Sequence, residues 1–292
     1  SIGGFYVVRP LGGGAAASEF IARRLEERNT PNAEQFALKV PDYDGAAARS
    51  LSEAEFSSFF RGEATALLGL PPSENVARFV TFDLGCKPKP ILVMELIEGP
   101  TLERFIAASE GAQNIRAVRA FDILDGVLAG LEVMHSHQLG HLDLKPSNVV
   151  LRGGKTPTLV DFGLAGRVVR PGCATGPYGA PEVWGVLPEG FRGEPSPMAA
   201  DVYAFGALAY EVFTGHTLFD GDSEVAIIGK HLIHDGHPPA LDRLANVRPL
   251  VELLEHTLRH DPRQRWTVPQ IRSALRAIGK VAGDFPWPLA AA

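Results

Sequence analysis

The sequence predicts an α+β protein in which a small strand-rich lobe is followed by a larger helical lobe. Up to about residue 97, short apolar runs alternate with turn-forming residues, a pattern that is typical of strands. Beyond residue 100, longer stretches carry apolar residues at the spacing of helix turns. Because the two patterns follow each other along the chain, we place the seam between the lobes at residues 97–102.

The individual elements follow from the same patterns. Apolar residues recur at helical spacing between Ala46 and Leu70, so one long helix is expected to interrupt the strands. Strands are predicted at FYVVRPL (5–11), EFIARRL (19–25), QFALKV (35–40), VARFVTFDL (76–84) and PILVMEL (90–96). Helices of the second lobe are predicted over residues 115–137, 201–215 and 248–260.

Composition excludes several classes of protein. The 292 residues carry 28 basic and 34 acidic side chains, and this net charge of −6 argues against a nucleic-acid partner. No apolar run approaches the ~20 residues that span a membrane, and the start of the chain lacks the pattern of a signal peptide. The two cysteines lack metal-ligand spacing, so we expect a cytoplasmic protein. Abundant Ala, Gly and Arg are compatible with a bacterial source.

A glycine-rich stretch, LGGGAAASEF, joins the first two predicted strands between Leu11 and Phe20. Glycines let backbone N–H groups approach phosphate oxygens, because no Cβ stands in the way. Taken alone, such a stretch is more often an ordinary hairpin turn. A phosphate-binding role is favoured only in combination with polar residues further along the chain.

Lys39 lies within an apolar predicted strand, FALKV. A lysine in such a position needs a charged partner, because burial of an unpaired ammonium is costly. Glu63, on the predicted long helix, is a candidate partner. The alternative is a strand lysine whose amine reaches solvent and an unrelated surface glutamate.

Four polar residues form the most specific pattern in the chain. HLDLKPSN places Asp143, Lys145 and Asn148 in one loop, and VDFGLA adds Asp161 eighteen residues after Asp143. An aspartate can orient a hydroxyl and accept its proton, while a second carboxylate with an amide can hold Mg²⁺ beside phosphates. Any one of these residues could cap a helix, but the whole set in this order indicates phosphate transfer.

These motifs resemble those of the eukaryotic-type, or Hanks-type, Ser/Thr protein kinases from about Phe5 to about Ile278. The resemblance implies a bilobal protein-kinase-like fold with a kinase domain at residues 1–278. Its N-lobe would cover about residues 1–97 and its C-lobe about 98–278. Residues 279–292 would form a C-terminal tail or linker.

The resemblance also implies how ATP would be bound. Gly12 and Gly14 would cover the phosphates, and Lys39, paired with Glu63, would contact the α- and β-phosphates. The residues expected around adenine are Leu11, Ala37 and Val150 on its two faces, Met94 at the gatekeeper position, and the hinge backbone of Glu95 and Ile97.

The catalytic roles carry over in the same way. Asp143 would be the catalytic base, Lys145 would steady the transferring phosphoryl group, and Thr175 would face Asp143. Asn148 and Asp161 would hold Mg²⁺ or Mn²⁺. Two structural contacts are also implied, namely an ion pair between Glu182 and Arg265 and an anchor from Asp201 to the backbone of the catalytic loop.

The function implied is ATP-dependent transfer of the γ-phosphoryl group to Ser/Thr hydroxyls of a protein substrate. Small-molecule kinases of the aminoglycoside type share the loop but lack the APE segment and the DVYAFG helix, which are present here. The main rival is a nucleotide-binding pseudokinase that acts as a scaffold. A regulatory protein or flanking domains are further possible partners.

Three positions depart from the family pattern. Ala17 replaces the third glycine, and Glu19 stands where a valine packs over adenine. A carboxylate there would repel phosphates, so we expect Glu19 to point outward or to pair with a nearby cation. Leu142 replaces the arginine that grips a phosphorylated activation loop, and the stretch 164–174 contains no Ser, Thr or Tyr. We therefore expect activity that does not depend on activation-loop phosphorylation, unless Leu142 is a neutral change.

Overall fold

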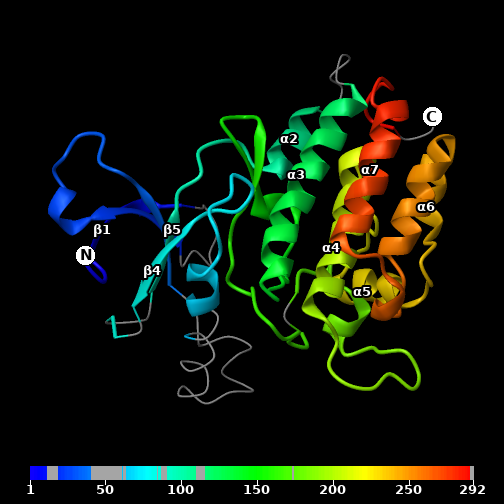
Figure 1. The fold of residues 1–292 in the computed structure, drawn as a ribbon, viewed down its shortest axis with the longest axis horizontal. Helices are drawn as coiled ribbons and strands as arrows, with labels where there is room; N and C mark the ends of the chain where they lie inside the picture. The colour runs from blue at the N-terminus through cyan, green and yellow to red at the C-terminus, as the bar shows by residue number, and fades with distance from the viewer. Residues whose placement is uncertain are drawn as a thin grey trace. The chain divides into compact units, whose positions relative to one another are not determined.

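The computed structural model divides the chain into two compact units, residues 1–97 and residues 98–292. Figure 1 shows a strand-rich first unit and a helical second unit, so the predicted α+β class is confirmed. The structure describes residues 1–11, 19–40, 61, 64–83, 85–86, 91–109, 116–172 and 174–289.

The first unit is built on one antiparallel sheet of five strands. The strand order is β1-β2-β3-β5-β4, so each strand pairs with the next in the chain except at the crossover from β3 to β4. The bounds are β1 Phe5–Pro10, β2 Glu19–Arg24, β3 Phe36–Lys39, β4 Phe79–Asp83 and β5 Ile91–Glu95. A short 3-10 helix, Leu25–Glu27, follows β2.

The two faces of this sheet have different contents, because successive side chains of a strand point to opposite faces. One face carries the core, in which the rings of Phe5 and Phe36 meet edge to face at 5.7 Å. The opposite face carries Ala37 and Lys39 of β3 and Met94 of β5. The core cluster consists of Phe5, Ala22, Phe36, Leu38, Cys86, Ile91 and Val93.

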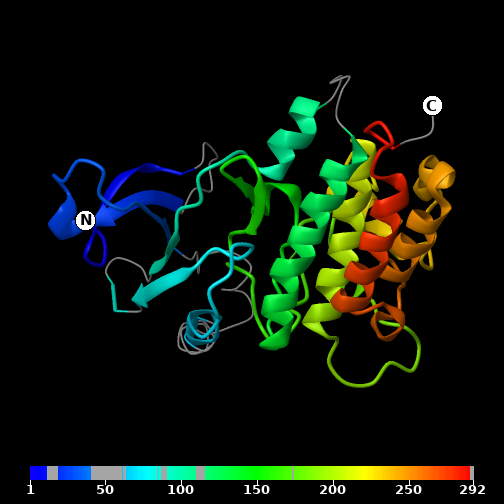
Figure 2. The same cartoon turned by 45° about the horizontal axis from the view of Figure 1, so that its top comes forward.

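The second unit consists mainly of helices, with one small hairpin near its start (Figure 2). The helices are α2 Leu102–Ser109, α3 Ala117–Ser136, α4 Pro197–Thr214, α5 Glu224–Leu232, α6 Arg248–Thr257 and α7 Val268–Ala282. The hairpin pairs β6 Val149–Arg152 with β7 Thr156–Leu159. Short 3-10 helices lie at Pro146–Asn148, Pro181–Trp184, Pro239–Val247 and Pro262–Gln264.

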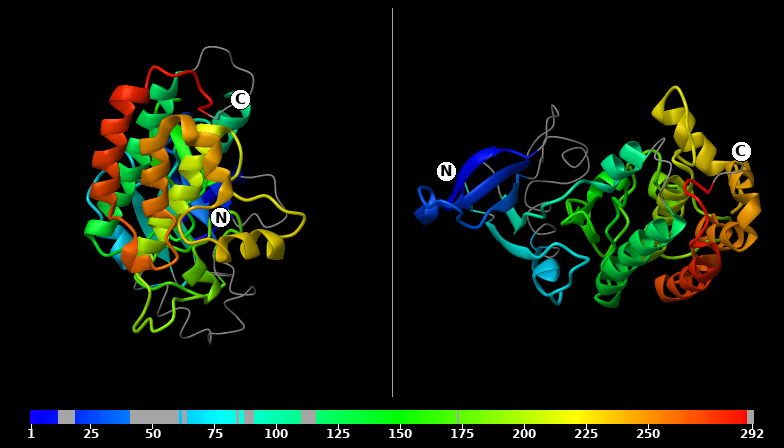
Figure 3. Two further views of the ribbon diagram at one scale, coloured as in Figure 1. Left: turned by 90° about the vertical axis from the view of Figure 1, so that its right-hand side faces the viewer. Right: turned by 90° about the horizontal axis from the view of Figure 1, so that it is seen from above.

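Helix α4 is the most deeply buried helix that the structure describes in this unit. Its start is fixed by Pro197 in the first turn and by Ser196, whose hydroxyl accepts the N–H of Ala199. It ends at Gly215, which adopts the left-handed conformation that glycine tolerates best. Helices α3 and α6 pack against it, and Figure 3 shows these helices in two further views. A helix apolar on all sides is thereby enclosed by its neighbours.

Helix α7 packs along α3 and is also tied to it by charge (Figures 1 and 2). Arg272 contacts Asp125 at 3.0 Å and Glu132 at 2.6 Å, and Arg276 contacts Asp125 at 2.7 Å.

No helix among the described residues is long and apolar enough to cross a membrane.

The C-terminal residues pack onto the helical unit as far as Leu289. The indole N–H of Trp287 donates to the carbonyl of Val212 at 2.5 Å, and the N–H of Leu289 donates to Phe213 at 2.7 Å. Both side chains are buried because they are apolar and meet the end of α4. Helix α7 also runs past residue 278, so the segment predicted as a tail or linker contributes to the packing of this unit.

The predicted strands and the predicted helices of the second lobe are present, with shifted ends. The long helix predicted between Ala46 and Leu70 lies mostly outside the described residues, of which 64–68 are helical. Helices α2 and α7 and the β6–β7 hairpin were not predicted. The signals of α2 and of the hairpin are weak, because α2 is short and each hairpin strand has only four residues. Helix α7 has a clear signal that was overlooked, namely a capping box formed by Thr267 and Gln270 and buried apolar residues at helical spacing.

The contact between α4 and α6 makes a prediction for Gly206. A Cβ at this position would collide with the hydroxyl of Thr257 and would lie 3.1 Å from Leu258 Cδ2. We expect Gly206→Ala to lower the free energy of unfolding by about 1–3 kcal/mol through overpacking, despite the better helix propensity of alanine.

Chemical denaturation of the purified protein measures this change. Gly229→Ala in α5 is the matched control, because a Cβ there meets no atom within 4 Å. The control should gain about 0.5–1 kcal/mol. A Gly206→Ala protein as stable as the wild type would contradict the packing described here.

Candidate active site

The β6–β7 hairpin brings two predicted metal ligands to neighbouring positions. Asn148 immediately precedes β6, and Asp161 follows β7 by two residues. Because the strands are antiparallel, these two ends lie side by side, and the N–H of Val160 donates to the carbonyl of Asn148 at 3.0 Å. Asp161 adopts a left-handed conformation, with φ of 60°, which turns the chain directly after the hairpin.

The carboxylate of Asp143 is the centre of a hydrogen-bond network. Its Oδ1 atom accepts the hydroxyl proton of Thr175 at 2.7 Å. Its Oδ2 atom accepts from the Lys145 amine at 2.8 Å and from the Asn148 amide at 3.0 Å. The Lys145 amine also donates to Thr175 Oγ1 at 2.9 Å, which closes a ring of three side chains. The structure thus brings together the predicted residues Asp143, Lys145, Thr175 and Asn148.

The side-chain oxygen atoms of Asn148 and Asp161 suit a magnesium ion that also binds phosphate. The Asn148 amide nitrogen donates to Asp143, which leaves the amide oxygen as the atom that can ligate a cation. In the described part of the chain, no group of three or more His, Cys, Asp or Glu side chains could hold a metal ion. Mg²⁺ fits this arrangement, because it is usually bound by one or two protein oxygens together with water and phosphate oxygens.

Asp201 anchors the backbone of the catalytic loop, as predicted. Its carboxylate is fully buried and accepts the N–H groups of His141 and Leu142, each at 2.7 Å. The His135 ring adds a third contact at 2.8 Å, which the sequence analysis missed. Leu142 has a φ of 62°, which is unfavourable for a leucine, and the bond from its N–H to Asp201 stabilises this conformation.

His141 fixes the other side of the same loop. Its Nε2 atom lies 2.9 Å from the carbonyl of Val160, so this nitrogen carries the proton and donates it. The Nδ1 atom is then an acceptor, and the N–H of Asp143 lies 3.4 Å from it. The Phe162 ring, beside Asp161, packs edge-on against His141 at 5.6 Å. The loop and the segment after β7 are therefore held to each other on this side.

The segment after Asp161 is anchored to the helical unit at several points. Gly140 and Gly166 exchange two backbone hydrogen bonds at 2.8 and 3.0 Å. The hydroxyl of Tyr178 donates to Glu211 on α4 at 2.6 Å. Burial raises the pKa of the Tyr178 hydroxyl, and the neighbouring Glu211 carboxylate raises it further. Tyr178 therefore stays protonated and keeps its role as a donor.

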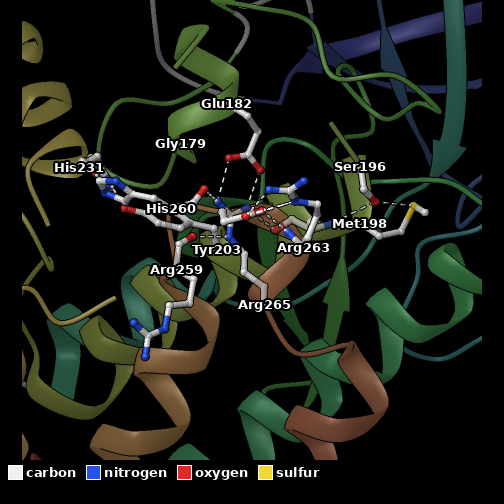
Figure 4. Close-up of polar contacts among 12 residues, drawn as sticks. Gly179, Glu182, Ser196, Met198, Tyr203, His231, Arg259, His260, Arg263 and Arg265 are labelled. Atoms are coloured by element: carbon white, nitrogen blue, oxygen red, sulfur yellow. Dashed lines mark hydrogen bonds and ion pairs between the residues drawn. The ribbon is translucent and has the colours of Figure 1, made fainter. Parts of the chain in front are cut away.

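An ion pair ties the end of this segment to the C-terminal part of the chain, as predicted. Arg265 contacts both carboxylate oxygens of Glu182, at 2.5 and 2.8 Å, and both side chains are completely buried. Figure 4 shows the two side chains facing each other. The guanidinium also donates to the carbonyls of Ala199 and Arg259 and lies 5.0 Å from the ring centre of Tyr203. Such full pairing is what a buried charge requires.

Leu142 lies among apolar residues of the segment. It lines a small cavity together with Leu164, Val169, Arg170 and Val183. Val169 and Val183 are buried, and the N–H of Gly172 donates to the carbonyl of Val183 at 2.7 Å. The position at which an arginine was expected is therefore occupied by a leucine that lies with three apolar side chains and Arg170.

Three of the predicted nucleotide residues of the first unit, Ala37, Lys39 and Met94, occupy one face of its sheet. Ala37 pairs with Met94 across β3 and β5, and Lys39 pairs with Leu92. Leu11 directly follows β1, and its N–H donates to the carbonyl of Glu19 at 2.9 Å. In the hinge segment, the N–H of Glu95 donates to Arg78 at 2.8 Å and Ile97 is buried. Val150, in the second unit, lies on β6 and forms a bridge with Thr101.

Lys39 forms an ion pair with Glu19. Its amine lies 3.1 Å from Glu19 Oε1, and the two residues are directly opposite each other in β2 and β3. Of the two orientations expected for Glu19, the structure contains the pairing with a cation. Lys39 was not predicted to be that cation, because the pairing depends on the register of β2 against β3. Glu63, the predicted partner of Lys39, lies outside the described residues, as do Gly12 and Gly14.

A hydrogen-bond chain that the sequence did not reveal lies beside Arg265. His234 Nδ1 accepts the N–H of Gly236 at 3.1 Å, so the proton is on Nε2, which donates to the Tyr203 hydroxyl at 3.0 Å. Tyr203 then donates to His231 Nδ1 at 2.8 Å. Figure 4 shows Tyr203 between His231 and Arg265. Burial lowers the pKa of His231 to about 4 and that of His234 to about 3.

Comparison with known proteins gives a family for this arrangement. Residues 6–275 match the family model described as the protein kinase domain. The chain is 36% identical to the serine/threonine-protein kinase PknL of Mycobacterium bovis over 219 residues, which are 71% of this chain and 52% of PknL. It is 31% identical over 296 residues to PkaA, a serine/threonine-protein kinase of Streptomyces coelicolor, covering 97% of this chain and 51% of PkaA.

A more distant relative is the serine/threonine-protein kinase PrkC of Bacillus subtilis. It is 28% identical over 231 residues, which are 79% of this chain and 33% of PrkC. The chain therefore spans about half the length of the first two curated relatives and less of the third.

The two buried histidines predict how stability depends on pH. Both have a lowered pKa and stay neutral in the folded state, whereas in the unfolded chain they are protonated below the ordinary value of 6.5. Unfolding therefore takes up two protons between about pH 6 and pH 4.5. As the pH decreases through this range, the two histidines lower the free energy of unfolding by about 2.7 kcal/mol per pH unit.

Urea denaturation at a series of pH values measures this slope. The His234→Gln protein takes up one proton fewer on unfolding. The slope of the free energy of unfolding against pH should therefore decrease by about 1.4 kcal/mol per pH unit, whatever the absolute stability of the variant. Equal slopes for the two proteins would show that His234 is not held neutral in the folded state.

Proposed function

Because the chain belongs to the protein kinase domain family, we propose that it transfers the γ-phosphoryl group of ATP to Ser or Thr hydroxyls of a protein. Members of this family use ATP with a divalent metal, generally Mg²⁺, and act on proteins. The observation that carries the proposal is the network in which Asp143 contacts Lys145, Thr175 and Asn148 at hydrogen-bonding distance.

The network suggests a division of work between the two oxygens of Asp143. Oδ2 already accepts from Lys145 and Asn148, whereas Oδ1 accepts from Thr175 alone among the bonds described. A carboxylate oxygen has about two acceptor positions, so Oδ1 is the atom that can orient the substrate hydroxyl and accept its proton. As that proton leaves, the hydroxyl oxygen forms a bond to the γ-phosphorus. At the same time the bond between the γ-phosphorus and the oxygen that links it to the β-phosphate breaks, so that ADP is the leaving group.

The other side chains stabilise charge rather than react. Lys145 is positioned to neutralise the transferring phosphoryl group while it still contacts Asp143. Asn148 and Asp161 would hold Mg²⁺, which neutralises charge on the phosphate oxygens. In the first unit, Lys39 would contact the α- and β-phosphates, and the face with Ala37 and Met94 would receive adenine. Catalysis in this scheme comes from positioning and from charge.

We also propose that activity does not depend on phosphorylation of the activation loop. Leu142 lies with Leu164, Val169 and Val183, where an arginine would hold a phosphate. The segment has other anchors that involve no phosphate, namely the Gly140–Gly166 bridge, the Gly172–Val183 bond and the Tyr178–Glu211 bond. Packing and backbone bonds would therefore order the loop that phosphate orders in relatives with the arginine.

A pseudokinase scaffold is the second candidate, and the Lys39–Glu19 pair favours it. In this reading Glu19 keeps the lysine from nucleotide phosphate altogether. The two candidates differ in a simple way. A scaffold would show no transfer from labelled ATP to any Ser/Thr peptide, whether or not it binds ATP.

Asp143→Asn tests the proposed catalytic role. It should reduce the phosphorylation rate at least ~100-fold, because the amide cannot accept the hydroxyl proton. Asp220→Asn is the matched control, since its side chain is 90% exposed and pairs only with the surface residue Lys230 among the contacts described. Transfer from labelled ATP to a Ser/Thr peptide library is the measurement, and circular dichroism checks that both variants fold. An Asp143→Asn enzyme with near wild-type activity would refute the role of Asp143.

Phosphatase treatment tests the proposed independence from phosphorylation. We expect the treated enzyme to keep its turnover within about threefold, because the anchors of the segment contain no phosphate. Mass spectrometry would verify that the treated protein carries no phosphate, and a mock-treated sample is the control. A loss of tenfold or more, about 1.4 kcal/mol in the barrier, would contradict this part of the proposal.

A further inference from the structure

We propose that Glu19 is an internal competitor for the Lys39 amine, so that nucleotide phosphate takes the lysine from this carboxylate when ATP binds. The inference rests on the proposed function, because it assumes that Lys39 is the lysine that contacts the phosphates. It assigns Glu19 a defined role, which is to set the affinity for the nucleotide. Nothing in the catalytic loop is required for this role.

The geometry of the sheet places Glu19 beside Lys39. Glu19 and Lys39 occupy directly opposed positions of β2 and β3, so their side chains leave the same face of the sheet. The Glu19 Oε1 atom lies 3.1 Å from the Lys39 amine. Ala37 and Met94 share this face with them through the β3–β5 register. The carboxylate is therefore on the face at which ATP is proposed to bind.

The backbone of Glu19 and of Lys39 is fixed by the sheet. The carbonyl of Glu19 accepts the N–H of Leu11 at 2.9 Å, on the β1 side of β2. Lys39 is flanked by Glu19 in β2 and by Leu92 in β5. Neither residue can move far without disrupting the sheet. When phosphate arrives, the Glu19 side chain must rotate away, or the carboxylate and the phosphate must share one amine at the cost of their mutual repulsion.

The ion pair between Glu19 and Lys39 is of moderate strength. The side chain of Lys39 is 20% exposed and that of Glu19 is 33% exposed, so water screens their attraction in part. A pair of this kind is weak enough for a triphosphate to displace it, because the triphosphate brings more negative charge to the amine than one carboxylate does. The pair should therefore lower nucleotide affinity without preventing binding.

The experiment measures nucleotide binding by calorimetry, with ATP and Mg²⁺ as one probe and adenosine as the other. Glu19→Gln keeps the size of the side chain and removes its charge. We expect this variant to bind ATP about two- to fivefold more tightly than the wild type, the effect of one partly exposed charge contact. Adenosine has no phosphate, so its dissociation constant should not change.

Glu34→Gln is the matched control. Glu34 is an exposed glutamate of the same unit that pairs with Arg78 at 3.3 Å, so its replacement alters net charge equally and leaves Lys39 untouched. It should bind ATP as the wild type does. The conservative variant Glu19→Asp, which keeps the charge, should stay closer to the wild type than Glu19→Gln does. The kcat should be the same in all four proteins, with the change confined to KM for ATP.

Other results would overturn the inference. If Glu19→Gln bound ATP more weakly and lost kcat, Glu19 would be orienting Lys39 rather than competing for it. If Glu34→Gln gained as much affinity as Glu19→Gln, the effect would come from net charge. If adenosine affinity rose in parallel with ATP affinity, the cause would be contact with the nucleoside. A wild type that bound no ATP would refute the proposed function, and this inference with it, whereas equal ATP binding by all variants would refute this inference alone.

Discussion

The buried carboxylate of Asp201 is the group on which the geometry of the catalytic loop depends. It receives the N–H groups of His141 and Leu142 at 2.7 Å and the His135 ring at 2.8 Å. These bonds stabilise a left-handed leucine, a conformation that costs roughly 1–2 kcal/mol by itself. The turn at Leu142 aims Asp143 at its partners. Since α4 is enclosed by its neighbours, the rigidity of the helix is passed on to the loop.

The resemblance to the protein kinase family was sufficient to predict the residues of the Asp143 network, because their types and order match the motifs of the family. Asp143, Lys145, Asn148 and Thr175 meet in the structure through the contacts given above. The partner of Glu19 was not predicted. It depends on the register of β2 against β3, which a sequence does not specify until the strand ends are known. Helix α7, in contrast, could have been predicted, because Thr267 and Gln270 form a capping box ahead of apolar residues at helical spacing.

Two of the three departures from the family pattern, Leu142 and Glu19, have physical consequences of different kinds. Leu142 stands where an arginine was expected, and it lies with Leu164, Val169, Arg170 and Val183 of the segment that follows Asp161, a contact that involves no phosphate. Glu19 introduces a charge next to the proposed phosphate-binding lysine. In the proposed scheme, the leucine at position 142 favours an active site that is ordered without phosphorylation. The glutamate at position 19 would make occupancy of the site more dependent on the concentration of ATP.

The most direct test is a crystal structure with a non-hydrolysable ATP analogue and Mg²⁺. The account predicts one bound nucleotide with the Lys39 amine within about 3 Å of its phosphate oxygens. It also predicts a metal ion about 2.0–2.1 Å from oxygens of Asn148 and Asp161. A nucleotide that contacts neither Lys39 nor a metal held by these two residues, or a crystal that excludes the analogue at saturating concentration, would contradict the account.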